Sequence, residues 1–296
     1  MEYKIDRNLG DFFKNEPMKK YTSFRVGGPA ELLIRPKDEE SLIKILKTIK
    51  ENNYKFYILG NGTNIIVKDR GFDGIIILLK DRLKDICVNG LRIRAGAGAS
   101  LKSLSNRAME NSLTGLEFAH GIPGSVGGAM VMNAGAYDGE MKNIVESVRV
   151  LDADGNIREY SNRQMNFSYR NSIVLEENLI VLSATFILEK GDKKAIKDKY
   201  EEFDRRRTEK QPLNLPSAGS TFKRPKGYFA GKLIDDSGLR GFKHKGAGIS
   251  DKHCGFVVNY DNASAKDILE TIEIVQKIVY DNFSVHLERE VKIIGQ

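Results

Sequence analysis

Glycine is concentrated between Gly115 and Gly128, where the chain reads Gly-Leu-Glu-Phe-Ala-His-Gly-Ile-Pro-Gly-Ser-Val-Gly-Gly. Five glycines in fourteen residues are more than a connection between two elements needs, and each one adds to the entropy lost on folding. Such a density is useful where the backbone must lie close to a ligand. A wall of backbone N–H groups, with the Ser125 hydroxyl beside it, suits a diphosphate. This segment therefore predicts a phosphate-binding loop.

A second glycine pair, Gly60 and Gly62, stands in Leu-Gly-Asn-Gly-Thr-Asn-Ile-Ile, between one apolar run and the next. Taken alone, the segment favours an ordinary Gly/Asn turn of a hairpin, although such a turn can also bring N–H groups close to a phosphate. It lacks the GxGxxG spacing, the helix opening at the glycines and the later acidic residue of a dinucleotide-binding fingerprint. A Rossmann dehydrogenase is therefore disfavoured.

The apolar pattern predicts an α+β chain. Leu42, Ile45, Leu46 and Ile49 recur at helical spacing and predict a helix over 38–53. A second amphipathic helix is expected around Leu101, Leu104 and Ala108. Strands are expected at 54–59, 65–67, 75–79, 91–95 and 179–188, with a hairpin over 147–160 that turns at Asp154-Gly155.

The last third of the chain changes character. Residues 192–210 are strongly charged, with Ile196, Tyr200 and Phe203 on one helical stripe, and Gln-Pro-Leu-Asn-Leu-Pro-Ser-Ala-Gly-Ser then breaks the periodicity. We expect a domain boundary near this point. Ser264 with Asp267 is a capping-box signature for a helix, and alternation over 285–294 predicts a final strand with Glu288 and Glu290 on one face.

Composition limits the function classes. A chain of 296 residues with 41% hydrophobic content can bury a core and suggests two domains. The net charge of +7 favours anionic partners, but basic residues are interspersed with acidic ones, unlike a nucleic-acid-binding arm. Cys87 and Cys254 are far apart and indicate neither a disulfide framework nor a zinc site. The N-terminus has no apolar signal region and no membrane-length apolar run follows, so we expect a soluble cytoplasmic protein.

Seven motifs in order resemble the UDP-N-acetylenolpyruvoylglucosamine reductase family: TSFRVGGPAE, GNGTN, EFAHGIPGSVGGAMVMNAGAY, YRNS, GSTFKRP, GKLIDDSGLRG and EREVKIIG. The resemblance runs from about Tyr21 to the C-terminus and points to the compact form without the extra substrate-capping loop. It implies an α+β fold with a two-part FAD-binding domain of the vanillyl-alcohol-oxidase type and a smaller α/β substrate-binding domain. The expected divisions are 1–20 as a lead-in, 21–200 for FAD (21–97 and 98–200) and 201–296 for substrate.

The resemblance also implies the cofactor and its site. FAD is expected to be bound non-covalently, with the two glycine loops on its diphosphate and the Gly27-Gly28 turn nearby. The expected FAD-binding residues are Arg35, Gly60, Asn61, Gly62, Thr63, Asn64, Gly121, Ile122, Pro123, Gly124 and Ser125.

Two further residues bear on these loops. In covalent relatives of this fold the linking histidine usually sits in the first loop, which here reads GNGTN, so we expect His120 to be a local hydrogen-bonding residue. Asp138 stands where the family pattern leads us to expect a second glycine. This departure leaves only the local geometry of the loop open.

The reaction implied by the resemblance is reduction of the enolpyruvyl ether of UDP-N-acetylglucosamine, with NADPH as co-substrate and hydride donor. Arg170, Ser220 and Glu290 match the family's catalytic residues. A guanidinium fork at Arg170 suits a carboxylate or enolate, and Ser220 corresponds to the proton donor. Without the resemblance, Ser220 would be interpreted as a turn residue, and the alternation around Glu290 fits a carboxyl facing a cleft as well as a solvated strand face.

Expected substrate contacts are Tyr169, Lys210, Arg224 and His253, of which Lys210 is the better match for the UDP diphosphate. For His253 and Lys232, structural or solvated roles are equally compatible with the sequence. We expect a monomer without nucleic-acid or membrane partners. The alternatives are another flavin oxidoreductase of the same fold and a basic nucleic-acid-binding protein.

Overall fold

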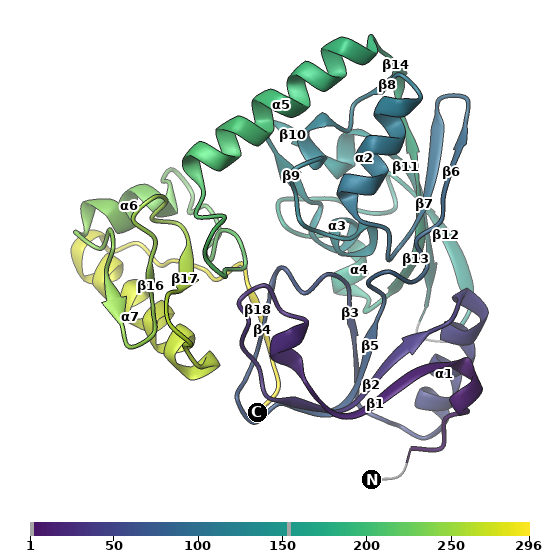
Figure 1. Cartoon of the computed structure of the whole chain (residues 1–296), viewed down its shortest axis with the longest axis horizontal. Coiled ribbons are helices and arrows are strands. Elements are labelled where there is room, and N and C mark those ends of the chain that lie inside the picture. Colours follow the sequence, from purple (N-terminus) through teal and green to yellow (C-terminus); the bar gives the residue numbers. More distant parts are fainter. Residues whose placement is uncertain (1–2, 153–154) are drawn as a thin grey trace. The chain divides into compact units, whose positions relative to one another are not determined.

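The computed structural model describes residues 3–152 and 155–296, which form two compact units (Figure 1). The first unit comprises Met1–Phe13, Leu33–Asn61 and Ile75–Arg207, and the second comprises Lys14–Leu32, Gly62–Gly74 and Thr208–Gln296. The chain passes from one to the other within strands, within a helix and between Asn61 and Gly62. The domain boundaries expected from the sequence stay a prediction.

An antiparallel five-stranded sheet in the order β12-β11-β13-β7-β6 forms the centre of the first unit. Helix α3 packs against β13 and β7, as Figure 1 shows. The predicted 147–160 hairpin is present as β11 and β12, but Asp154 of its turn lies outside the described residues. The strands are β6 (Ile86–Asn89), β7 (Arg92–Gly96), β11 (Val145–Leu151), β12 (Ile157–Ser161) and β13 (Ile180–Ile187), and α3 is Val126–Met132.

A second sheet has the order β1-β2-β5-β3, and three of its strands continue into the second unit. Strands β3 and β5 are parallel, with Leu59 opposite Leu78, so the first glycine loop leaves from the carboxyl end of β3. The predicted helix α1 is capped by Asp38, whose side chain accepts from Ser41 N at 2.8 Å. The bounds are β1 (Gly10–Pro17), β2 (Pro29–Pro36), β3 (Phe56–Leu59), β5 (Phe72–Leu78) and α1 (Glu39–Glu51).

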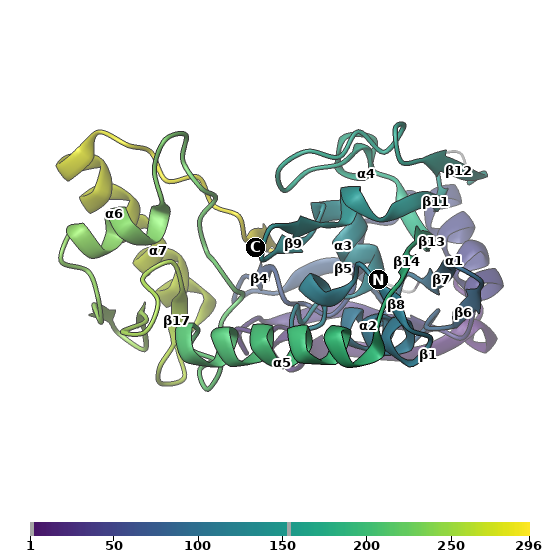
Figure 2. The ribbon, with the colours of Figure 1, turned by 90° about the horizontal axis from the view of Figure 1, so that it is seen from above.

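Helix α5 begins at Lys193 and ends at Lys210, as the stripe of Ile196, Tyr200 and Phe203 predicted. It lies beside α2 (Figure 2), and the Tyr200 hydroxyl donates to Ser105 O at 2.6 Å. Smaller elements complete this unit: η1 (Arg7–Leu9), α2 (Leu101–Glu110), β8 (Leu113–Thr114), η3 (Glu117–Ala119), β9 (Gly135–Ala136), β10 (Gly139–Glu140), η4 (Met141–Asn143), α4 (Ile173–Glu176) and β14 (Glu189–Lys190).

The turn between β9 and β10 explains the departure at Asp138. Tyr137 and Asp138 have φ of 51° and 64°, so both central residues are left-handed, as a tight hairpin turn requires. Glycine is the usual residue at such a position because it lacks a Cβ, but aspartate tolerates the left-handed region better than most residues. The Asp138 turn therefore has the geometry that a glycine would adopt.

The second unit draws one core from all three of its segments. Phe24, Ile66 and Ile272 belong to the same buried cluster. Its sheet has the order β15-β16-β17, and β4 pairs with β18 in parallel. Helix α7 has the predicted Ser264–Asp267 capping box. The bounds are η2 (Met18–Lys20), β4 (Ile65–Val67), α6 (Ala230–Asp236), β15 (Lys243–His244), β16 (Ala247–Ile249), β17 (Val257–Asn259), α7 (Ala265–Phe283) and β18 (Lys292–Ile294).

The predicted strand over 285–294 is wrong in length. Only Lys292–Ile294 forms a ladder, whereas Arg289 makes an isolated bridge to Phe222. Leu287 and Val291 are buried as the alternation indicated, because an extended segment alternates even without a continuous partner. Within the described ranges, no helix is both long enough and apolar enough to span a membrane.

Candidate active site

The two glycine loops are brought together in the first unit. A Cβ added to Gly60 would lie 2.4 Å from Ser125 Oγ, so only glycine permits this approach with the serine in place. Asn61 Nδ2 donates to Pro123 O at 3.1 Å. The segments that the sequence marked separately as phosphate loops are therefore direct neighbours at Gly60, Asn61, Pro123 and Ser125.

Backbone bonds to residues 97–101 hold the longer loop in place. Leu101 N donates to Gly124 O at 3.1 Å, and Val126 N donates to Ala99 O at 2.9 Å. Ser125 is the N-cap of α3, and its hydroxyl accepts from Gly128 N at 3.3 Å. Hydrogen bonds within the protein thus hold the geometry of this loop.

Several backbone donors remain at this junction. The N–H groups of Gly60, Asn61, Gly121, Gly124 and Ser125 have no acceptor among the residues that the structure describes. Donors gathered on two adjoining loops are the arrangement that a diphosphate needs, since phosphate oxygens accept several hydrogen bonds at once. The residues at this junction therefore fit the diphosphate of FAD.

Arg207, near the end of α5, was missed by sequence reasoning. Its Nη1 lies 3.2 Å from the position that a Gly121 Cβ would occupy, so this guanidinium lines the second loop. Burial lowers the pKa of Arg207, while the charges of Tyr137 and Asp204 act to raise it. The signal available in the sequence was the Arg205-Arg206-Arg207 run on a helix whose opposite stripe is apolar.

His120 has the local role expected for it. Its Nδ1 lies 3.3 Å from Asp204 Oδ1, and its ring stacks on Tyr200 with centroids 4.3 Å apart. Burial raises the pKa of Tyr200, so its hydroxyl stays protonated as a donor. His120 thereby helps to join the glycine loop to α5, and non-covalent FAD binding remains a prediction.

Arg170 lies in a strained turn that is tied to α3. Its φ is 55°, in the left-handed region that costs a residue with a Cβ about 1–2 kcal/mol. Asn133, the C-cap of α3, donates through Nδ2 to Ser168 O at 3.2 Å. Arg170 itself lies over the Tyr169 ring at 5.0 Å, and Tyr169 is 52% exposed. Strain held by such contacts is common at functional sites.

Ser220 and Glu290 come from neighbouring segments of the second unit. Glu290 N donates to Thr221 O at 2.8 Å, and Lys223 N donates to Glu288 O at 2.8 Å. Thr221 is buried and accepts from Val257 N through its hydroxyl at 3.1 Å. The structure therefore pairs the segments that carry Ser220 and Glu290, while Arg170 belongs to the first unit.

The predicted first loop is divided between the units, because Gly60 and Asn61 belong to the first unit and Gly62 begins a segment of the second. Gly62 has φ of 65°, and a Cβ there would lie 1.8 Å from Tyr21 O. Ser23 N donates to Gly62 O at 2.9 Å, and Ser23 Oγ is buried without a hydrogen-bond partner among the described residues. Asn64 contacts Glu290 rather than only the loop, since its Nδ2 lies 3.3 Å from Glu290 O.

The remaining predicted residues are more scattered. Arg35, on β2, has a buried Nε with no hydrogen-bond partner in the described part of the chain. Lys210 is exposed at the end of α5, and Arg224 stacks on Phe229 at 3.9 Å. Lys232 pairs with Asp236 on α6. His253 Nδ1 accepts from Gly255 N at 3.1 Å, and burial lowers its pKa.

Comparison with known proteins identifies the class first. Residues 30–161 match the FAD binding domain family. A cholesterol oxidase structure from Brevibacterium sterolicum shares the fold over 64% of this chain and 40% of its own, with a TM-score of 0.51 and 16% identity. The two-part FAD-binding fold is confirmed, and the chain is an FAD-dependent oxidoreductase.

The family follows from longer matches. Residues 211–294 match the C-terminal domain of UDP-N-acetylenolpyruvoylglucosamine reductase. The enzyme of that name from Clostridioides difficile is 53% identical over 286 residues, covering 97% of this chain and 94% of its own length. The one from Caldanaerobacter subterraneus subsp. tengcongensis is 51% identical over 97% of this chain and 95% of its own.

A solved structure agrees with these relatives. The UDP-N-acetylenolpyruvylglucosamine reductase from Thermus caldophilus superimposes with a TM-score of 0.82 at 34% identity, covering 97% of this chain and 99% of its own. This chain belongs to the UDP-N-acetylenolpyruvoylglucosamine reductase family.

Proposed function

We propose that this protein reduces the enolpyruvyl ether of UDP-N-acetylglucosamine to UDP-N-acetylmuramate with NADPH as hydride donor, as a cytoplasmic monomer in peptidoglycan precursor synthesis. The observation that carries the proposal is the pairing of the Ser220 and Glu290 segments through Glu290 N and Thr221 O at 2.8 Å. Family membership supplies the reaction class, and this pairing makes the segments that carry Ser220 and Glu290 hydrogen-bonded neighbours.

FAD, when bound, supplies hydride chemistry between NADPH and the terminal vinyl carbon of the substrate. Hydride delivery leaves enolate character next to the substrate carboxylate, where a fixed positive charge lowers the barrier. Arg170 suits this task because its guanidinium forms paired hydrogen bonds with a carboxylate. The strained turn that carries Arg170 is tied to α3, whose other end bears the phosphate loop.

A proton must then reach the carbon that bears the ether oxygen. Ser220 can donate it from Oγ when nearby groups support the resulting alkoxide. Glu290, held beside this segment, would act as the third catalytic group on the enolate side. Tyr169, Lys210, Arg224 and His253 are proposed substrate contacts, and Arg35 with the two glycine loops is proposed to hold FAD non-covalently.

The absorbance of bound flavin tests the proposal in two half-reactions. Under anaerobic conditions NADPH should bleach the flavin, and UDP-N-acetylglucosamine enolpyruvate should restore its colour. Recovery with oxygen but not with the enolpyruvyl sugar would overturn the substrate assignment in favour of a flavin oxidase. Colourless protein that binds nucleic acid in a salt-sensitive way would overturn the flavin site.

A further inference from the structure

Asn64 is the last residue of the first glycine loop and comes directly before β4. This strand pairs in parallel with β18, in the register Ile65 with Lys292 and Val67 with Ile294. The ladder of β18 begins at Lys292, so Glu290 lies two residues ahead of it. The hydrogen bond from Asn64 to Glu290 therefore restrains the chain at a residue that precedes the β4–β18 ladder.

Asn64 makes two hydrogen bonds to the final segment, one to Glu290 and one to Lys292. Its main-chain oxygen accepts from Lys292 N at 3.1 Å, and its side-chain Nδ2 donates to Glu290 O at 3.3 Å. Glu290 N is bonded on the other side, to Thr221 O at 2.8 Å. The N–H and the carbonyl of Glu290 are thus both hydrogen-bonded, which fixes the position of its Cα. The direction of the carboxyl group then depends on the side-chain torsions alone.

We propose that Asn64 is a positioning residue for Glu290, an inference that rests on the proposed function of Glu290. The amide donor fixes the Glu290 carbonyl and thereby the direction in which the carboxyl group leaves the backbone. Displacement of a reacting group by about 1 Å lowers rates by about 100-fold. This role replaces the FAD contact that the resemblance implied for Asn64, whose Nδ2 donates to Glu290 O. Gly60 and Asn61 still present donors to the cofactor.

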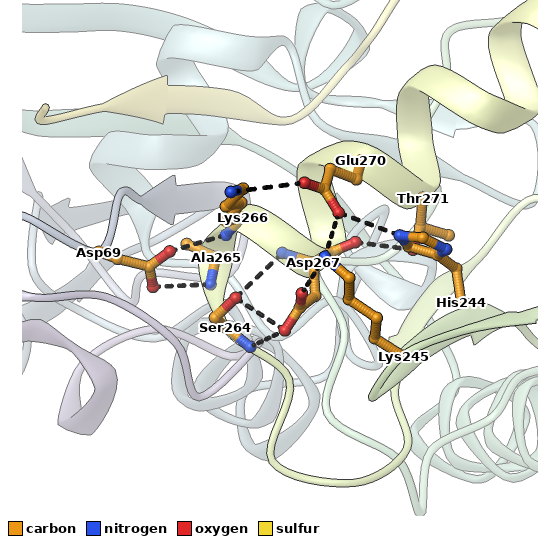
Figure 3. A network of polar contacts seen from close by, with 9 residues as sticks. All are labelled: Asp69, His244, Lys245, Ser264, Ala265, Lys266, Asp267, Glu270 and Thr271. Carbon is orange, nitrogen blue, oxygen red and sulfur yellow. Dashed lines mark hydrogen bonds and ion pairs between the residues drawn. The ribbon is translucent and has the colours of Figure 1, made fainter.

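The chain offers a matched control in Asp69. Its carboxylate accepts from Ala265 N at 2.9 Å and from Lys266 N at 2.8 Å, as Figure 3 shows. Asp69 therefore joins the same 62–74 segment to the same C-terminal segment as Asn64 does. It does so through the first turn of α7 and not through Glu290, so a general loosening of this unit should appear equally in both sets of variants.

The experiment measures both half-reactions in stopped flow on FAD-loaded full-length protein. Asn64→Asp is nearly isosteric but replaces the donor with an oxygen facing a carbonyl oxygen, and Asn64→Ala removes the amide. For both we expect unchanged flavin content and flavin reduction by NADPH within about 2-fold of wild type. Reoxidation by the enolpyruvyl sugar should slow by about 10- to 100-fold. Asp69→Asn should lower the melting temperature and leave reoxidation within about 2-fold of wild type.

A double-mutant cycle separates positioning from a merely structural role. In a Glu290→Gln background, adding Asn64→Asp should slow reoxidation by less than about 3-fold, because the group that Asn64 aims is already lost. An undiminished effect there would overturn the proposal, and so would loss of flavin or slowing of both half-reactions, which would assign Asn64 to the cofactor. If wild-type protein were not reoxidised by the substrate, the proposed function would fail before any variant is compared.

Discussion

The glycine loops of the first unit and the Ser220–Glu290 segments of the second are built on different principles. At Gly60 and Ser125 the backbone itself is the binding surface, and the absence of a side chain permits the approach. Around Glu290 the proposed chemistry belongs to side chains, and the segments that carry them are joined by main-chain hydrogen bonds and by the Asn64 amide. A site made of backbone groups is recognisable in the sequence by its high glycine content. A site made of single side chains such as Ser220 and Glu290 has no such composition.

The largest expected effect concerns a side chain of the second unit. Ser220→Ala should slow flavin reoxidation by the enolpyruvyl sugar by about 10²- to 10⁴-fold, the usual contribution of a positioned proton donor. Flavin reduction by NADPH should be unaffected, because Ser220 has no part in it. Stopped-flow absorbance measures both, with Ser217→Ala as the matched control. Equal slowing of the two half-reactions would show that Ser220 is not the donor.

FAD binding at the glycine loops should weaken when a side chain is added to a glycine. Gly60→Ala places a Cβ 2.4 Å from Ser125 Oγ, so the hydroxyl must turn away and the phosphate-facing surface changes. We expect FAD to bind about tenfold more weakly, which is about 1.4 kcal/mol. Fluorescence titration of the apoprotein with FAD measures the affinity. Gly90→Ala controls for backbone strain alone, because Gly90 has φ of 61° and a Cβ there meets nothing within 4 Å; equal affinities of the two variants would argue against a preformed cradle.

Loss of the helix cap at Ser264 should lower stability without changing FAD binding or the half-reactions. Ser264 Oγ accepts from Asp267 N at 3.0 Å at the start of α7, so Ser264→Ala should cost about 1 kcal/mol of stability. Thermal unfolding should show a decrease of about 2–4 °C, with kinetic constants unchanged. A change in reoxidation rate without loss of stability would mean that α7 influences the active site directly.

The smallest expected effect is the pH dependence that His253 contributes. Burial lowers the pKa of His253 from its ordinary value of 6.5, and its Nδ1 must be unprotonated to accept from Gly255 N. Below 6.5, and down to the folded-state pKa, the unfolded chain binds more protons, so stability decreases as the pH falls. His253→Gln should flatten this part of the melting-temperature profile.

Local features were predictable from the sequence and long-range ones were not. The α7 capping box follows from Ser264 and Asp267, which are three residues apart and act on the same helical turn. The end of the chain was predicted as a strand over 285–294, since alternation records which side chains are buried but not whether a partner strand is present. The partner of Lys292–Ile294 is β4, far away in the sequence.

The same distinction applies to the site. The glycine loops were marked by composition, yet their approach at Gly60 and Ser125 depends on two sheets and could not be measured in advance. Ser220 and Glu290 were identified only through family resemblance, and the structure adds that their segments are hydrogen-bonded neighbours. Arg207 and the contact of Asn64 with Glu290 were missed, because a charged helix and an Asn after glycines are both common.

The pairing of β4 with β18 has a consequence for biosynthesis. The strand Ile65–Val67 emerges from the ribosome long before its partner Lys292–Ile294. Closing so long a loop is entropically demanding, and the apolar β4 edge must wait unpaired in the nascent chain. We expect the second unit to resist protease only after residue 294 has left the exit tunnel, which stalled nascent chains of increasing length would reveal; protection at much shorter lengths would contradict this order of folding.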